Sequence, residues 1–353
     1  MPSCRAACLA LALTLSPASS NAETPTVQHT RVDPTGQLLG TVSRLNRKEI
    51  AAVKRRAEAG NPEDQLKFGW ICETRYKAIG LSLAEGHTQA IAWFEKAALQ
   101  GNALAQSTFA SLKAGNPSEM LFWYQRAAEQ GEIGAAYSIG QMYLDGVAPG
   151  SPEPSQAAHW FLVAAKGGDV EAAFKVGSFY EKGYGVPQDS AEAARWYGVA
   201  AQQGWQPAEL SLGELYETGR GVPKNAQEAV RWYSKIADKY GDAAYRYASL
   251  ITQRRVESEG GVDAQRLYRR AAALYKRDVN AGDGAAAQKL GHMYELGIGV
   301  PRSLADAYFW YSIADQESCP AAADIQRVKG RLTAKQINDV QRRIESATSA
   351  PGG

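Results

Sequence analysis

A repeat of about 36 residues runs through most of the chain, and it constrains the fold more than any other feature. Each copy joins a segment of the form L-G-x-x-Y-E-x-G-x-G-V-P to one of the form E-A-x-x-W-Y-x-x-A-A-x-Q-G, most clearly over 176–204 and 212–237. The second segment carries a large anchor residue, and successive anchors lie 30, 37, 36, 36, 35 and 43 residues apart: Trp93, Trp123, Trp160, Trp196, Trp232, Leu267 and Trp310. A fixed period of this length is typical of stacked structural repeats.

Each half of the repeat has the spacing and end signals of a helix. The first half contains a glycine, Gly177 in the clearest copy. Since glycine costs about 1 kcal/mol relative to alanine inside a helix, we expect a neighbouring helix to approach it closely. The first helix is predicted to end at a glycine such as Gly183, and Pro187 prevents it from resuming. The second helix is predicted to begin with a capping box, formed by Asn116 and Glu119, Asp189 and Glu192, Asn225 and Glu228, or Ser303 and Asp306.

One helical hairpin cannot bury its own apolar face, so the copies are expected to stack. We therefore predict an all-α protein, a right-handed α-solenoid of about seven helix-turn-helix repeats over residues 47–316. We expect an extended N-terminal segment over 23–46 and a capping helix region over 317–346, with a helix from about Thr333 to Ile344. Residues 347–353 are expected to form a disordered tail.

The first 22 residues have the layout of a secretory signal peptide. Arg5 provides a positive start, residues 6–15 are apolar, and 20–22 offer small residues for cleavage after Ala22. The apolar run is too short to span a bilayer. We expect a periplasmic or secreted mature chain without a membrane span; the alternative is the apolar leader of a cytosolic protein.

The two motifs resemble the Sel-one-like (Sel1-like) repeat, a relative of the tetratricopeptide repeat, over about residues 48–316. The segments at 307–311 and 332–337 also resemble the closing element of such proteins. The resemblance implies an adaptor that holds protein partners, often in bacterial envelopes or in secretion and signalling assemblies. Two copies depart from the pattern. The repeat that ends at Trp123 lacks the G-x-G-V loop. The copy between Ala248 and Leu267 has residues 253–261 instead of that loop, and its second helix is expected to be about seven residues longer.

No catalytic or metal-binding motif appears in the sequence. H-E-x-x-H, G-x-S-x-G, a Walker loop and C-x-x-C are absent, the four histidines lie far apart, and no serine has a lysine three positions later. The formal net charge of +2 does not indicate nucleic acid or an anionic membrane as partner. We therefore predict a non-catalytic scaffold for a protein partner, with no cofactor and no metal. The main alternative is a module of the envelope that binds a cell-wall saccharide or other polysaccharide; an enzyme is the third.

Candidate contact residues lie at positions where the repeat tolerates change. Trp205 follows a closing glycine, and its counterparts are polar and expected to be solvated: Asn102, Glu132, Asp169, Asp242 and Asp283. An exposed tryptophan there is a hot-spot candidate; the alternative is that it packs over the neighbouring turn. Another candidate is a ridge at the variable position of the G-x-G-V loops, formed by Tyr184, Arg220 and Ile298. The loop residues Arg254 and Arg255, with the basic run over 266–277, are candidates for an acidic partner or, alternatively, a solvated helix face.

Overall fold

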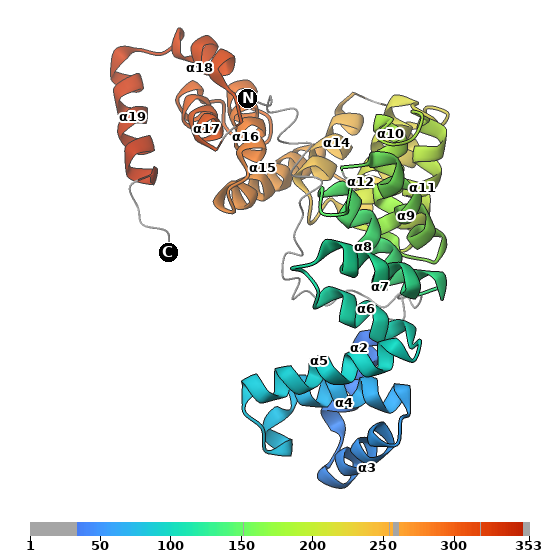
Figure 1. Cartoon of the computed structure of the whole chain (residues 1–353). Helices are drawn as coiled ribbons and strands as arrows, with labels where there is room; N and C mark the ends of the chain where they lie inside the picture. Colours follow the sequence, from blue (N-terminus) through green and yellow to red (C-terminus); the bar gives the residue numbers. More distant parts are fainter. Residues whose placement is uncertain (1–33, 151, 254, 257–260, 318, 349–353) are drawn as a thin grey trace. The chain divides into compact units, whose positions relative to one another are not determined.

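The computed structural model describes residues 34–348 except 151, 254, 257–260 and 318. Over these residues the chain forms the α-helices α2 to α19 and one short 3-10 helix, η1, and no strand (Figure 1). The two helices of a repeat pack as a hairpin: α8 (Ile133–Leu144) packs with α9 (Pro154–Lys166), and α10 (Val170–Lys182) packs with α11 (Ser190–Gln202). The next hairpin then packs on the one before it, as α10 does on α9. The predicted all-α repeat fold is confirmed.

The helices fall into two compact units. Among the described residues, the N-terminal unit comprises 34–208 and 220–222. It contains α2 (Pro34–Arg44), α3 (Arg47–Glu58), α4 (Pro62–Thr74), η1 (Tyr76–Ile79), α5 (Leu83–Leu99), α6 (Ala103–Ser111), α7 (Pro117–Glu129), α8 (Ile133–Leu144), α9 (Pro154–Lys166), α10 (Val170–Lys182) and α11 (Ser190–Gln202). The C-terminal unit comprises 209–219 and 223–348 among the described residues. It contains most of α12 (Gln206–Thr218) and then α13 (Ala226–Ile236), α14 (Gly241–Thr252), α15 (Ala264–Asn280), α16 (Gly284–Leu296), α17 (Leu304–Gln316), α18 (Ala322–Lys329) and α19 (Ala334–Thr348).

The glycine of the first helix lies directly under an aromatic ring of the second helix. A Cβ atom on Gly177 would lie 2.6 Å from Cδ1 of Tyr197, and one on Gly213 would lie 2.5 Å from Cε1 of Tyr233. The predicted close approach is therefore confirmed. The ring belongs to the residue that follows the anchor tryptophan, because that side chain points into the hairpin. Tyr233, for example, is fully buried, whereas the anchor Trp232 is only partly buried.

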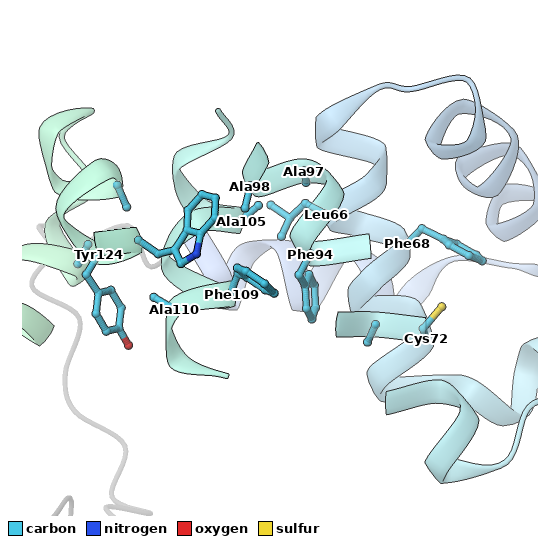
Figure 2. Close-up of a cluster of buried hydrophobic side chains, with 14 of the residues drawn as sticks. Leu66, Phe68, Cys72, Phe94, Ala97, Ala98, Ala105, Phe109, Ala110 and Tyr124 are labelled. Atoms are coloured by element: carbon cyan, nitrogen blue, oxygen red, sulfur yellow. The ribbon is translucent and has the colours of Figure 1, made fainter. Parts of the chain in front are cut away.

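Large and small side chains alternate in the core of the N-terminal unit. Figure 2 shows the rings of Phe94 and Phe109 on successive hairpins, with Leu66, Ala98 and Ala105 grouped beside them in the same core cluster. Phe109 also meets Trp123 edge to face, with ring centroids 5.5 Å apart. Alanine on the facing helix leaves the room that each ring fills, so the hairpins stack closely.

The predicted helix starts and stops are present, with one difference in the caps. Asp189 accepts hydrogen bonds from the backbone of Ala191 and Glu192, and Asn116, Asn225 and Ser303 cap their helices in the same way. The reciprocal half of the box is missing at these four starts. At α11, for example, the Glu192 carboxylate instead pairs with Arg195 at 2.8 Å. Complete capping boxes occur at three other starts, Asn46 with Glu49, Ser82 with Glu85 and Thr333 with Gln336, which were not predicted as capping boxes.

The ends of the described chain differ from prediction in two places. Residues 34–44 form α2 rather than an extended segment, because Leu38 and Val42 lie one helical turn apart and pack on the core, with Val42 buried. At the other end the predicted closing helix is present as α19, and Val340 on it is buried. A short helix, α18, precedes it and was not predicted. Among the described helices none has the length and apolar character needed to cross a membrane.

The departing repeat between Ala248 and Leu267 is accommodated by a longer second helix. Helix α15 has 17 residues and α11 has 13, so the extension is four residues, and the predicted seven is wrong. The extra turn brings Tyr275 over α14, where a Cβ atom on Gly241 would lie 2.6 Å from its ring. This repeat has Ala248 where the regular copies have the helix glycine, and its glycine–tyrosine contact lies instead at the start of α14.

Candidate functional site

The C-terminal unit contains a pocket of about 480 Å³, which we call the C-terminal pocket. Side chains of α12, α14, α16 and α18 line it, together with one tyrosine each from α15 and α17. The lining residues are Glu217, Asp242, Tyr245, Arg246, Ser249, Tyr275, Gln288, Lys289, His292, Tyr311 and Asp324. A concave site of this size with aromatic walls and converging polar groups is the default location for a bound ligand or partner segment.

Helix α14 supplies more of the pocket than any other helix. It contributes Asp242, Tyr245, Arg246 and Ser249, which lie three and four residues apart and therefore share one face of the helix. The opposite face carries Ala243, Ala244, Tyr247 and Ala248, all buried in the core. The amphipathic pattern of α14 therefore fixes which of its side chains reach the pocket.

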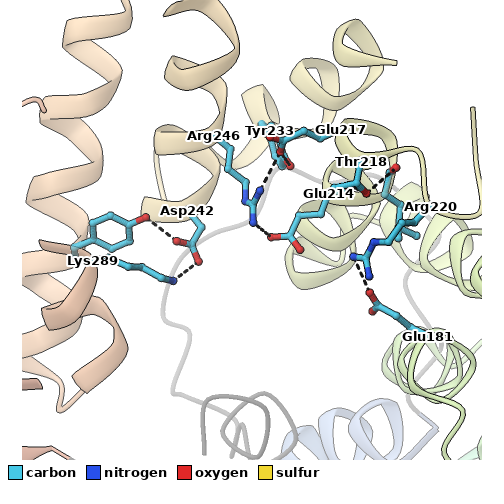
Figure 3. Close-up of polar contacts among 11 residues, drawn as sticks. Glu181, Glu214, Glu217, Thr218, Arg220, Tyr233, Asp242, Arg246 and Lys289 are labelled. Carbon is cyan, nitrogen blue, oxygen red and sulfur yellow. Dashed lines mark hydrogen bonds and ion pairs between the residues drawn. The ribbon is translucent and has the colours of Figure 1, made fainter. Parts of the chain in front are cut away.

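One wall of the pocket is an ionic network centred on Arg246. Its guanidinium contacts the Glu214 carboxylate at 2.9 Å and donates to Glu217 at 3.0 Å (Figure 3). Glu217 also accepts a hydrogen bond from the Tyr233 hydroxyl at 2.7 Å. Burial raises the pKa of Tyr233, so its hydroxyl keeps its proton and acts as the donor. Arg246 thus ties α14 to α12 and holds two carboxylates at the edge of the pocket.

Asp242 organises the facing wall. Its two oxygens accept separate hydrogen bonds, one from the Tyr275 hydroxyl at 2.6 Å and one from the Lys289 ammonium at 2.7 Å (Figure 3). Burial acting alone would raise the pKa of Asp242, but Lys289 and Tyr275 outweigh it and the pKa lies below its ordinary value. Asp242 is therefore ionised near neutral pH, and it links α14, α15 and α16.

A third group of charges closes the end of the pocket near α18. Arg327 donates to Glu295 at 2.7 Å and pairs with Asp324 at 2.7 Å. Glu295 also accepts from the Tyr311 hydroxyl at 2.9 Å. The hydrogen bonds from Arg327 lower the pKa of Glu295 below its ordinary value, and Tyr311 adds to the effect.

The same tyrosine–glutamate–arginine contact recurs in three repeats. Tyr197, Tyr233 and Tyr311 each donate to a glutamate sixteen residues earlier. An arginine further along the chain pairs with that glutamate: Arg220 and Arg246 from the next repeat, and Arg327 from α18. These contacts were not predicted from the sequence, although the sequence contains a signal for them. The glutamates 181, 217 and 295 each lie four residues after the helix glycine, and the tyrosines lie twenty residues after it.

The structure changes the interpretation of Trp205. Four of its counterparts cap helices: Asn102, Glu132, Asp169 and Asp283 each accept hydrogen bonds from the first turn. They do so because this position precedes a helix with unpaired backbone N–H groups. The expectation of solvation is wrong for Asp169, which is buried, and the other three are half-buried. Trp205 itself directly precedes α12 and is half-buried. Its indole nitrogen is buried and has no hydrogen-bond partner within the described part of the chain.

The other predicted contact residues do not lie in the C-terminal pocket. Tyr184 is exposed and meets Phe179 edge to face at 5.3 Å. Arg220 is exposed and pairs with Glu181 at 3.1 Å. Ile298 is half-buried and packs on the core of the C-terminal unit, so it adds little to an exposed ridge. Arg255 is exposed, whereas Arg254 lies outside the described residues. Their role in binding remains a prediction.

The basic run on α15 forms an exposed face. Arg266, Arg269 and Lys276 are exposed, and Arg270 and Arg277 donate to the backbone carbonyls of Asp238 and Lys239. Part of this run therefore holds the loop before α14 in place. Across the residues that the structure describes, no group of three His, Cys, Asp or Glu side chains is arranged to hold a metal ion.

Comparison with protein families finds matches to the Sel1 repeat at residues 80–102, 114–132, 133–169, 170–205, 206–240 and 284–314, together more than half of the chain. The interval that the family model leaves unmatched between the last two copies is 241–283, which contains α14 and α15. Five of the eleven lining residues come from this interval. Comparison with curated proteins gives no match.

Several solved structures are similar to this chain. A protective antigen of uropathogenic Escherichia coli with an SLR fold is 19% identical, with a TM-score of 0.47 over 86% of this chain and 94% of its own. A Sel1 repeat protein from Oxalobacter formigenes is 28% identical, with a TM-score of 0.47 over 61% of this chain and 85% of its own. An immunity protein from Pseudomonas aeruginosa is 20% identical, with a TM-score of 0.34 over 62% of this chain and 83% of its own.

Proposed function

Since the chain belongs to the Sel1 repeat family, we propose that it is a non-catalytic scaffold of the cell envelope or exterior that holds a segment of a protein partner in its C-terminal pocket. Sel1 repeat proteins are typically scaffolds for protein–protein interactions, and the family is generally non-catalytic. The proposal adds to this the site of binding and the compartment.

The observation that carries the proposal is the C-terminal pocket itself. Its polar groups are fixed by neighbours before any partner arrives: Asp242 by Tyr275 and Lys289, and Arg246 by Glu214 and Glu217. Side chains that are already ordered lose less conformational entropy when a partner binds, which favours recognition. A catalytic role would need a nucleophile or a general base close to an activating partner. The lining carboxylates Glu217, Asp242 and Asp324 are instead each paired with a cation, and the pKa of Asp242 lies below its ordinary value.

Export is supported by the leader-like residues 1–22, which lie outside the described part of the chain. A positive residue, an apolar run and a small-residue cleavage site in this order are typical of secreted proteins. N-terminal sequencing of the mature protein from a periplasmic extract would test this point, and a chain that keeps residues 1–22 would contradict it.

Crosslinking in cells tests the scaffold. The tagged full-length protein is crosslinked and purified, and its partners are identified by mass spectrometry for wild type, Ser249→Arg, Trp205→Ala and Arg269→Ala. Ser249 lines the pocket, so an arginine there fills it; Arg269 is exposed on α15 and outside the pocket. We expect specific envelope proteins with wild type and Arg269→Ala, and their loss with Ser249→Arg.

The outcomes separate the alternatives. If Trp205→Ala removes the partner and Ser249→Arg does not, binding occurs at the position that the sequence singled out and the pocket is not the site. If no protein is enriched and wall or capsule glycans are recovered, the saccharide-binding alternative replaces the scaffold. Circular dichroism of each variant shows whether its helices are intact.

A further inference from the structure

The C-terminal pocket is lined by more negative than positive charge. Glu217, Asp242 and Asp324 face two permanent cations, Arg246 and Lys289, so the lining has a formal charge of −1 with His292 neutral. A negative lining favours a cationic group over an anionic one in the pocket.

Both permanent cations of the lining are already paired with carboxylates. Lys289 donates to Asp242, and Arg246 is held between Glu214 and Glu217. An anionic group entering the pocket would have to compete with these carboxylates at distances of 2.7 to 3.0 Å. Such an exchange replaces existing ion pairs instead of adding new ones.

The carboxylates keep capacity for a further donor. Asp242 accepts one hydrogen bond at each oxygen, and each carboxylate oxygen can accept two. An incoming cation can therefore add to the contacts of Asp242 without removing Tyr275 or Lys289. The added bond would be charge-assisted and correspondingly strong.

An aromatic ring stands beside these carboxylates. Tyr245 is half-buried in the lining, and its ring is held edge to face against Tyr268 at 5.3 Å. Its hydroxyl makes no hydrogen bond to the residues described by the structure, so no polar contact fixes this side of the pocket. The face of a tyrosine ring attracts cations, and Lys289 already lies 5.6 Å from the centroid of the Tyr275 ring in the same pocket.

We infer that the C-terminal pocket recognises a basic side chain of the partner, an arginine or a lysine, which stacks on Tyr245 and donates to Asp242. This inference rests on the proposed function, because it names the chemistry of the partner segment in the same pocket. The repeat that supplies Asp242 and Tyr245 is the one that the family model leaves unmatched, so the specificity belongs to this chain's own departure from the repeat.

Peptide selection tests the inference without knowledge of the partner. A phage library of random nonapeptides is panned against the full mature chain and, in parallel, against Ser249→Arg. We expect the wild type to enrich Lys or Arg over Asp or Glu at an aligned position by about tenfold or more, and the enrichment to disappear with Ser249→Arg. Enrichment of acidic residues, absence of enrichment, or enrichment that survives Ser249→Arg overturns the inference.

A selected peptide then gives a finer test through its dissociation constant. Replacing its basic residue with glutamine is expected to weaken binding about tenfold. Tyr245→Leu is expected to weaken binding by about three- to tenfold, whereas Tyr245→Phe keeps the ring and should bind as the wild type does. Equal binding by the leucine and phenylalanine variants overturns the role of the ring. If crosslinking finds a partner lost with Ser249→Arg while selection yields acidic peptides, the scaffold stands and only the basic chemistry fails.

Discussion

The contact between the helix glycine and the tyrosine ring can be tested with two alanine substitutions in adjacent helices. Gly177 in α10 lies under Tyr197, and a Cβ atom there would be 2.6 Å from Cδ1 and 2.7 Å from Cε1 of the ring. Gly198 lies inside α11, and a Cβ atom there would meet nothing within 4 Å. Both glycines are in helix interiors of the N-terminal unit, so the two variants gain the same helix propensity and differ in the contact alone.

The expected free energies follow from two opposing effects. Alanine in place of glycine favours a helix by about 1 kcal/mol, so Gly198→Ala is expected to stabilise the unit by about 0.5–1 kcal/mol. At Gly177 the new methyl group lies roughly 1 Å inside the normal separation of two carbon atoms. Tyr197 cannot turn away easily, since its ring is buried and its hydroxyl is bonded to Glu181 at 2.8 Å. Overpacking costs about 1–3 kcal/mol, so Gly177→Ala should be less stable than Gly198→Ala by about that amount.

Urea unfolding combined with hydrogen exchange measures this difference. Stacked repeats need not unfold in a single step, so exchange of the amides in α10 and α11 is needed beside the global transition. We expect slower exchange in Gly198→Ala and faster exchange in Gly177→Ala, relative to wild type. If the two variants are equally stabilised, the close approach does not explain the recurring glycine.

Two further predictions concern the charges of the C-terminal unit. Arg246→Met should destabilise the protein by about 1–2 kcal/mol, because it leaves Glu214 and Glu217 without their shared cation. Arg269 makes only an exposed ion pair, so Arg269→Met should change the stability by less than about 0.5 kcal/mol. Equal urea unfolding midpoints of the two variants would contradict this prediction. The depressed pKa values of Asp242 and Glu295 give a stabilisation that is present above the unfolded values of about 3.9 and 4.3 and is lost as the pH falls through the lower folded values. The thermal unfolding midpoint, measured from pH 7 to pH 2, should therefore fall below about pH 4, and it should fall less in the Asp242→Asn, Glu295→Gln double variant. If the midpoint falls equally steeply with pH in that variant, Asp242 and Glu295 are not the source of the pH dependence.

The regular part of the fold was predictable because its signals are local and repeated. The anchor spacing predicted the stacked hairpins, and the recurring glycine predicted a close helix contact that Gly177 and Gly213 make. The capping residues Asp189 and Ser303 were read correctly as helix starts. These features depend on neighbours within one hairpin, so one copy of the repeat contains the information and the other copies reinforce it.

The errors arose where a position has two possible partners. The reciprocal contact of the capping box competes with an arginine three residues further on, and at α11 the Arg195 pair forms instead. The residue after the closing glycine was interpreted as a solvated turn, but it is followed at once by a helix, so Asp169 is buried as a cap. In α2, Val42 is buried because α4 provides a surface for it, and that surface is not visible in residues 34–44 alone.

The sequence by itself determined the repeat, the helices, their ends and the absence of a recognisable catalytic motif. Only the tertiary structure forms the pocket in which we propose that a partner is held. Glu217, Asp242 and Lys289 lie on the first helices of three successive repeats and Asp324 lies on α18, and they meet because stacking brings these helices together. The longer α15 adds Tyr275 to this group by placing its hydroxyl on Asp242. The physical reason is that periodicity fixes each hairpin from short-range contacts, whereas a pocket depends on the register between hairpins, which is set by packing across the whole stack.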